Sequence, residues 1–61
     1  MKIEQWREYR AIEATAEAHE RDAKHEMAEG NPRKGKVYAT LAVSARLEAL
    51  SYAIRYGGGE P

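Results

Sequence analysis

The pattern of apolar and polar positions divides the chain into two long helical segments. Residues 3–29 contain no Gly or Pro and are rich in Ala, Glu, Arg and Lys, which are strong helix formers. Apolar side chains recur there every three or four residues, as on one face of an amphipathic helix. The pattern predicts a first helix over about residues 3–29, with an apolar stripe made of Trp6, Tyr9, Ile12, Ala16, His19, Ala23 and Met27.

The second segment, residues 32–56, is apolar on two sides. Val43, Leu47, Leu50 and Ile54 follow the spacing i, i+4, i+7, i+11, which is typical of a narrow coiled-coil seam. A second apolar stripe on nearly the opposite side consists of Tyr38, Leu41, Ala45, Ala49, Tyr52 and Tyr56. One neighbouring helix covers only one side, so the other side is expected to meet another copy or another protein. Which stripe faces the first helix remains open at this point.

The residues between the two segments predict a tight reversal of the chain. Gly30 is placed to end the first helix, and Asn31-Pro32 to begin the second, since Asn is a favoured N-cap and Pro a favoured first helical residue. A joint of residues 30–31 between two helices of roughly 37–40 Å implies an antiparallel hairpin. The second helix is expected to end at the glycines from 57 onward, and residues 57–61 to form a mobile tail.

Length and composition favour an assembly. The 61 residues form a single all-α domain, and a two-helix antiparallel hairpin cannot enclose a core, so we expect it to oligomerise into a helical bundle. The absence of Cys excludes disulfides and thiolate metal sites. No apolar run approaches the ~20 residues that span a membrane, and the first residues lack a signal-peptide stretch. We therefore expect no membrane partner and a reducing, cytoplasmic setting.

The formal net charge of zero hides an asymmetry between the two segments. Residues 1–29 carry a net charge of −3, and residues 30–61 a net charge of +3. Antiparallel pairing of such segments is electrostatically favourable, within one chain or between chains. A neutral total argues against generic nucleic-acid binding, which depends on a large positive field.

The first turn of the second helix is basic, with Arg33, Lys34 and Lys36. Helix N-termini expose unpaired N–H groups and favour acidic side chains, so each cation there costs on the order of a few tenths of a kcal/mol. This cost suggests that an anion lies near the joint, and two identities for it stay open. Either the joint is a solubilising turn whose charges meet the acidic helix of a neighbour, or the joint binds phosphate. It is not a P-loop, because the Gly-Lys-Ser/Thr ending is missing.

Other residues were weighed for ligand binding, metal binding and catalysis. Tyr9, Arg10 and Tyr38 join the basic joint as candidate ligand-binding residues, since rings stack on bases and Arg binds phosphate. At helical spacing such rings more often belong to an interface core, and we expect an oligomer core of Trp6, Ile12, Val43, Leu47, Leu50, Tyr52, Ile54 and Tyr56. The spacing of His19, Asp22, His25 and Glu26 partly matches a di-metal bundle site, but packed or solvent-facing histidines explain it better. We expect no catalytic residues, metal or cofactor, because nothing beside Ser44 or Ser51 predicts an oxyanion hole.

The stretch from Ser44 to Arg55 resembles the second helix of a family of small helical-hairpin proteins. These are the anti-CBASS and anti-Thoeris sponges that phages use against nucleotide-signalling immunity. They share a Leu-rich helix that ends in an aromatic-Ala-x-(Arg/Lys)-Ala/Ile pattern, as Tyr52-Ala53-Ile54-Arg55 does here. Tyr9-Arg10 and Asn31-Pro32-Arg33 are also similar.

The resemblance implies a homo-oligomer that binds a cyclic oligonucleotide or related signal without cleaving it. Its pockets would lie between subunits, where basic side chains hold phosphates and aromatic rings stack the bases. The residues alone leave a second function open: a structural or protein-interaction bundle, acting as an adaptor or inhibitor, with no small-molecule ligand.

Overall fold

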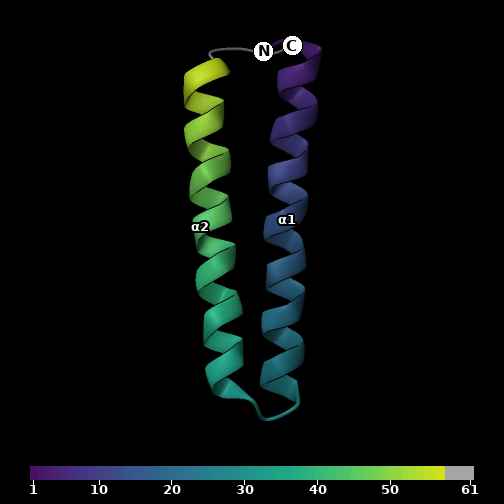
Figure 1. Ribbon diagram of the computed structural model, residues 1–61, viewed down its shortest axis with the longest axis vertical. Helices are drawn as coiled ribbons and strands as arrows, with labels where there is room; N and C mark the ends of the chain where they lie inside the picture. The colour runs from purple at the N-terminus through teal and green to yellow at the C-terminus, as the bar shows by residue number, and fades with distance from the viewer. Residues whose placement is uncertain (58–61) are drawn as a thin grey trace.

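The computed structural model describes residues 1–57 as two long helices packed side by side in opposite directions (Figure 1). Helix α1 spans Ile3–Ala28 and helix α2 spans Pro32–Tyr56. The molecule is a rod 42 Å long, with the joint at one end and Ile3 and Tyr56 at the other. The predicted all-α antiparallel hairpin is confirmed, and α1 ends one residue earlier than expected. Of the predicted mobile tail, residues 58–61 lie outside the described residues.

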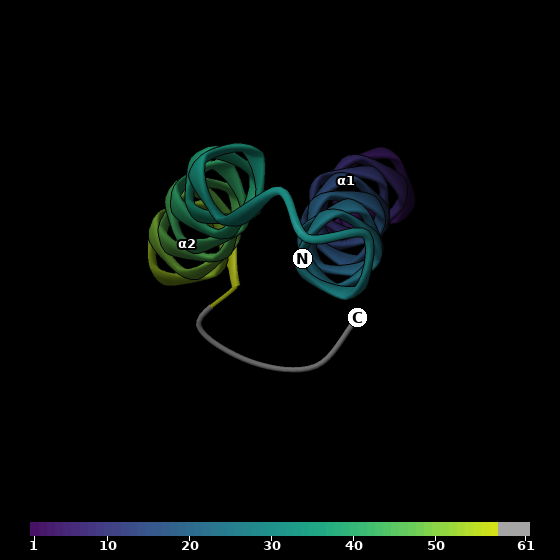
Figure 2. The ribbon, with the colours of Figure 1, turned by 90° about the horizontal axis from the view of Figure 1, so that it is seen from below.

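The chain reverses through a hydrogen-bonded helix end at Gly30 (Figure 2). Gly30 has φ +80°, a left-handed conformation that favours glycine. Its N–H donates to the carbonyl of Met27 at 3.2 Å, and the N–H of Asn31 donates to the carbonyl of Glu26 at 2.8 Å. These two bonds form a Schellman motif, which pairs carbonyls that the end of α1 would otherwise leave free. The stop predicted at Gly30 is confirmed.

Asn31 precedes α2 as expected, but its side chain does not cap the helix. Its amide Nδ2 instead donates to Oε2 of Glu26 at 3.0 Å, which ties the joint back to α1. The expectation that the Asn31 side chain caps α2 is therefore wrong. Because this side chain bonds to Glu26, the first N–H groups of α2 receive no acceptor from it.

The contact between the helices is made of small side chains. The buried side chains are those of Ala16 on α1 and Ala42, Ala45 and Ala49 on α2, and no large side chain of the described residues is fully buried. Larger groups, including Tyr9, Ile12, His19, Tyr38 and Tyr52, are half-buried along the margins of this contact. The stripe of α2 that contains Ala45, Ala49 and Tyr52 therefore faces α1, which answers the question that the sequence left open.

The other apolar stripe of α2 stays in solvent. Val43, Leu47 and Leu50 are 57–59% exposed, and Ile54 is 75% exposed. These four residues are called the outer stripe below. Burying one such side chain is worth about 1.5–3 kcal/mol, so the hairpin leaves a large part of its apolar free energy unused. Leu41 is also exposed, although its spacing places it with the stripe that meets α1.

Gly35 has a packing role that the sequence did not indicate. It lies in the first turn of α2 and is buried against α1. A Cβ added there would lie 2.6 Å from Sδ of Met27 and 3.4 Å from the carbonyl oxygen of Ala23. Glycine thus lets the first turn of α2 lie close to the last turns of α1.

Replacing Gly30 with Ala should destabilise the hairpin by about 1–2 kcal/mol, because a Cβ is disfavoured in the left-handed conformation. Nothing lies within 4 Å of the added Cβ, so the loss of stability would come from backbone strain alone. Gly30→Asn is the matched control, since Asn tolerates this conformation. Urea unfolding at one protein concentration measures both. Equal stability of Gly30→Ala and the unchanged chain would contradict the Schellman reversal.

Replacing Ala16 with Leu should destabilise the protein by roughly 1–3 kcal/mol, because a larger side chain pushes the closely packed helices apart. Ala14 is exposed on the same helix, so Ala14→Leu should change stability by less than about 0.5 kcal/mol. Thermal unfolding followed by circular dichroism compares the two variants. If both cost the same, the alanine contact does not position the helices.

Candidate functional site

The basic joint lies at one tip of the rod and is open to solvent. Arg33, Lys34 and Lys36 are exposed, and none of them lies within ion-pair distance of a carboxylate among residues 1–57. A shallow hollow of about 350 Å³ is lined by Gly30, Asn31, Pro32, Arg33 and Lys34. Arg33 and Lys34 therefore flank a helix start whose first N–H groups lack a side-chain cap, and Lys36 lines the neighbouring hollow.

The carboxylates of the neighbouring last turn of α1 have partners of their own. Glu26 accepts the hydrogen bond from Asn31, and Oε1 of Glu29 lies 4.0 Å from Nε2 of His25. Neither carboxylate pairs with the cations of the joint. The tip as a whole thus keeps its positive side chains available to an anion.

The remaining predicted ligand residues lie elsewhere. Tyr9 and Arg10 are near the terminal end of the rod, where the Trp6 and Tyr9 ring centroids are 5.6 Å apart and Arg10 pairs with Glu13 at 3.0 Å. Tyr38 lies on α2 beside His19, with ring centroids 6.4 Å apart. One chain therefore does not bring Tyr9 or Arg10 to the basic joint, and a shared site needs a second chain.

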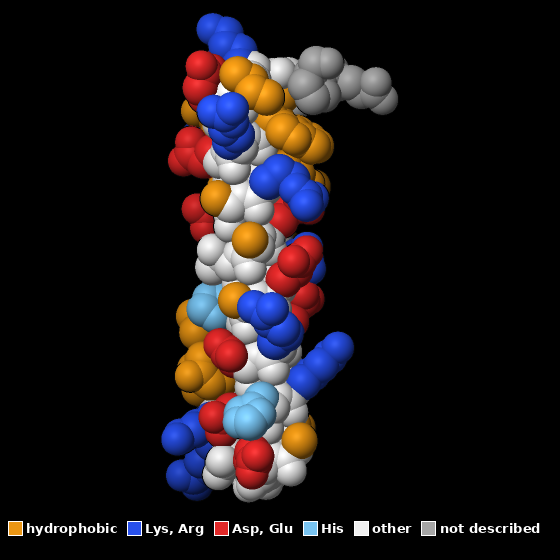
Figure 3. All heavy atoms as spheres, turned by 90° about the vertical axis from the view of Figure 1, so that its right-hand side faces the viewer, with side chains coloured by type: hydrophobic (Ala, Val, Ile, Leu, Met, Phe, Trp, Pro, Cys, Tyr) orange, Lys and Arg blue, Asp and Glu red, His pale blue; other side chains and the backbone are white. Residues whose placement is uncertain are grey.

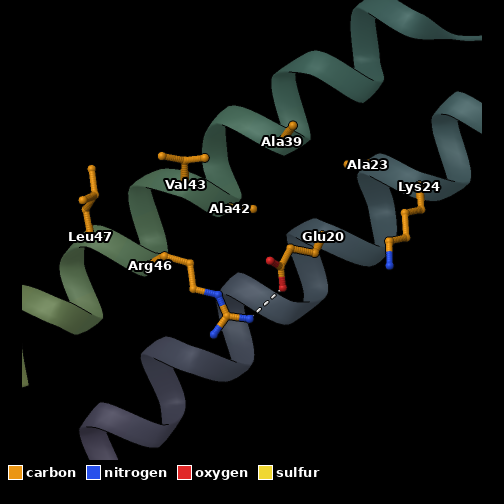
Figure 4. A pocket seen from close by; sticks show the side chains of 8 residues that line it. All are labelled: Glu20, Ala23, Lys24, Ala39, Ala42, Val43, Arg46 and Leu47. Atoms are coloured by element: carbon orange, nitrogen blue, oxygen red, sulfur yellow. Dashed lines mark hydrogen bonds and ion pairs between the residues drawn. The ribbon is translucent and has the colours of Figure 1, made fainter.

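A groove runs along one side of the contact between α1 and α2 (Figure 4). It encloses about 530 Å³ and is lined by Glu20, Ala23 and Lys24 of α1 and by Ala39, Ala42, Val43, Arg46 and Leu47 of α2. A smaller hollow of about 320 Å³ continues it past Met27, Gly35 and Lys36. In Figure 4 the side chain of Leu47 rises from α2 away from α1. The groove therefore connects the outer stripe with the basic joint.

One ion pair bridges the helices across this groove. Arg46 donates from Nη2 to Oε1 of Glu20 at 2.7 Å. The hydrogen bond and charge of Glu20, with smaller contributions from Glu17 and Glu13, raise the pKa of Arg46 above its usual value. This pair joins an acid of the acidic first segment to a base of the basic second segment, as their opposite net charges led us to expect. Because both side chains are 44% exposed, the pair contributes little to the stability of the hairpin.

The histidines are separated by the fold. His19 faces Tyr38, and its buried Nδ1 finds no hydrogen-bond partner among residues 1–57, whereas His25 lies on the surface near Glu29. Within residues 1–57, no three His, Asp or Glu side chains are grouped in a way that holds a metal ion. Neither α1 nor α2 has an apolar stretch long enough to cross a membrane.

The outward face of α1 mixes acidic and basic side chains along its length (Figure 3). The larger apolar groups are seen at the upper end and the lower left edge of this view, with smaller ones along its middle. Three other surface features of the hairpin stand out: the outer stripe, the groove and the basic joint. Sequence reasoning found the first and third. It missed the groove, because only the packing of the helices brings Glu20 beside Arg46.

Comparisons with protein-family models, curated proteins and solved structures found no match for this chain. The site is therefore interpreted from its own geometry and charge.

Above pH 10, the ionisation of Tyr52 should make the free energy of unfolding depend on pH. Its hydroxyl lies 3.4 Å from Oε2 of Glu8, and burial first, then the charge of Glu8, raises its pKa. The unfolded chain loses this proton near pH 10, whereas the folded chain holds it to higher pH. The resulting stabilisation is complete below pH 10 and is lost as the pH rises through the folded-state pKa.

Glu8→Gln keeps an acceptor but removes the negative charge, so Tyr52 should then ionise at a lower pH. Phenolate absorbance measures this, with Tyr52→Phe used to subtract the other tyrosines. An unchanged titration of Tyr52 in Glu8→Gln would show that Glu8 does not act on it.

Proposed function

We propose that this chain is a homo-oligomeric helical hairpin that binds and holds a phosphate-bearing nucleotide signal, of the cyclic-oligonucleotide type, without cleaving it. The observation that carries the proposal is the basic start of α2, whose three cations have no ion-pair partner among the described residues. Helix N-termini ringed by Lys and Arg are suited to phosphate groups, because N–H donors and positive charge converge there.

Self-association is supported by the outer stripe and by the weakness of the contact inside the hairpin. Four large apolar residues are exposed in a row, while the buried contact consists of alanines and Gly35. A two-helix unit of this size rarely supplies enough stability by itself. Covering the outer stripe in an oligomer would supply the missing apolar burial.

Capture without cleavage is proposed because the side chains that line the hollow at the joint offer phosphate positive charge and N–H donors. They include no carboxylate, imidazole or thiol that would act as a general base. Rings at the terminal end, including Trp6 at 38% exposed and Tyr56 at 40% exposed, are open to stacking on bases.

A second candidate function is a protein-interaction module that takes no small-molecule ligand. The observation that favours it is the same exposed outer stripe, because a helix from a different protein fits such a face as well as another copy does. In that case the basic joint would pair with acidic side chains of the partner protein.

Native mass spectrometry with a panel of cyclic di- and trinucleotides and ADP-ribose-type signals tests the proposal. We expect an oligomer that retains integer numbers of nucleotide, and a melting temperature that rises with ligand concentration. Arg33→Glu/Lys34→Glu should weaken retention roughly a hundredfold or more, since each lost charge-assisted contact is worth ~1.5–3 kcal/mol. The oligomer should stay intact.

Arg7→Glu/Arg21→Glu is the matched control, because both residues are exposed on α1 and the change in net charge is the same. It should leave retention unchanged. An oligomer that retains no nucleotide from the panel would favour the protein-interaction module. Equal losses in the two double variants would show that only overall charge matters.

A further inference from the structure

The outer stripe reads the same in both directions along α2. Its members are separated by four, three and four residues, with β-branched Val43 and Ile54 at the ends and Leu47 and Leu50 in the middle. Two antiparallel copies of such a row align residue by residue about a two-fold axis that passes between the two leucines. Val43 then faces the partner's Ile54, and Leu47 faces the partner's Leu50.

We infer that the outer stripe is a two-fold seam, in which α2 of one copy packs antiparallel on α2 of a second copy. This inference rests on the proposed function, which already requires self-association, and it names the surface and symmetry. A two-fold interface uses one patch twice, so the patch must complement itself. The symmetric spacing gives the outer stripe that property, which a different protein partner would not require.

The proposed register sets the length of the contact. Residues 41–56 of the two α2 helices overlap, which is roughly 24 Å of the 42 Å rod. All four residues of the outer stripe are more than half exposed, so the surface to be buried is already in place.

The proposed seam brings like charges near each other, but they are paired within their own chains. A two-fold axis leaves Arg46 of the two copies on the same flank of the seam, five residues or about 7.5 Å apart along the helix. Each Arg46 is paired with Glu20 of its own hairpin, which reduces the repulsion between the two copies.

Disulfide trapping tests the direction of the seam, because the natural chain has no Cys. Val43→Cys and Ile54→Cys chains, differing in mass by a tag, are oxidised separately and then as a mixture. The two-fold seam predicts a crosslink between the two different chains in the mixture, and little crosslinking of either chain alone. Crosslinking of each variant with itself would indicate a parallel seam and overturn the inference.

A charge exchange tests the same register without crosslinking. Leu47→Glu/Leu50→Glu should abolish the association, since four carboxylates then meet at the axis. Leu47→Glu/Leu50→Lys should restore it in part, because each Glu then faces a partner's Lys. A parallel seam would place like charges together in both variants. Sedimentation measures the oligomer, and helicity by circular dichroism checks that the hairpin persists.

The outcomes separate this inference from the proposed function. An oligomer that retains nucleotide in Leu47→Glu/Leu50→Glu would overturn the seam while leaving the proposed function standing. If trapping confirms the seam but the protein retains no nucleotide, the inferred seam stands and the proposed nucleotide binding is wrong. A natural chain that stays monomeric at high micromolar concentration would overturn both.

Discussion

The contact through alanine and glycine between α1 and α2 is the constraint on which the rest of the structure depends. Ala16, Ala42, Ala45 and Ala49 are buried, and Gly35 lies against Met27, so the helices can lie close together. Close packing along small residues aligns the helices but buries little apolar surface. The large apolar side chains of α2 are consequently left on the outside.

Electrostatics acts on this frame in two different places. Along the middle of the rod, Arg46 pairs with Glu20 of the facing helix. At the tip, Arg33, Lys34 and Lys36 meet no carboxylate among the described residues, although the last turn of α1 is acidic. Glu26 there accepts a hydrogen bond from Asn31, and Glu29 lies 4.0 Å from His25. The surplus positive charge of the second segment is thus concentrated at one end, where a helix start adds to it.

Much of this arrangement was predictable from local patterns. The run without Gly or Pro, Gly30 at a helix end and Pro32 at a helix start gave both helices to within one residue, because those signals act on neighbouring backbone. The basic joint was also evident, since its residues are adjacent in the chain. The groove was not, because Glu20 and Arg46 come together only when the helices pack. The side chain of Asn31 was misjudged for the same reason: a carboxylate of α1 competes with the helix start for its amide.

The sequence by itself determined that there are two helices, that they reverse at Gly30, and that α2 carries two apolar stripes. Each follows from spacing and backbone preference along one stretch of chain. Only the tertiary structure decided which stripe faces inward. Both stripes are hydrophobic enough to be buried, but the one with Ala45 and Ala49 allows a closer approach of the helices. Steric fit between helices, rather than hydrophobicity alone, therefore placed Val43, Leu47, Leu50 and Ile54 on the outside.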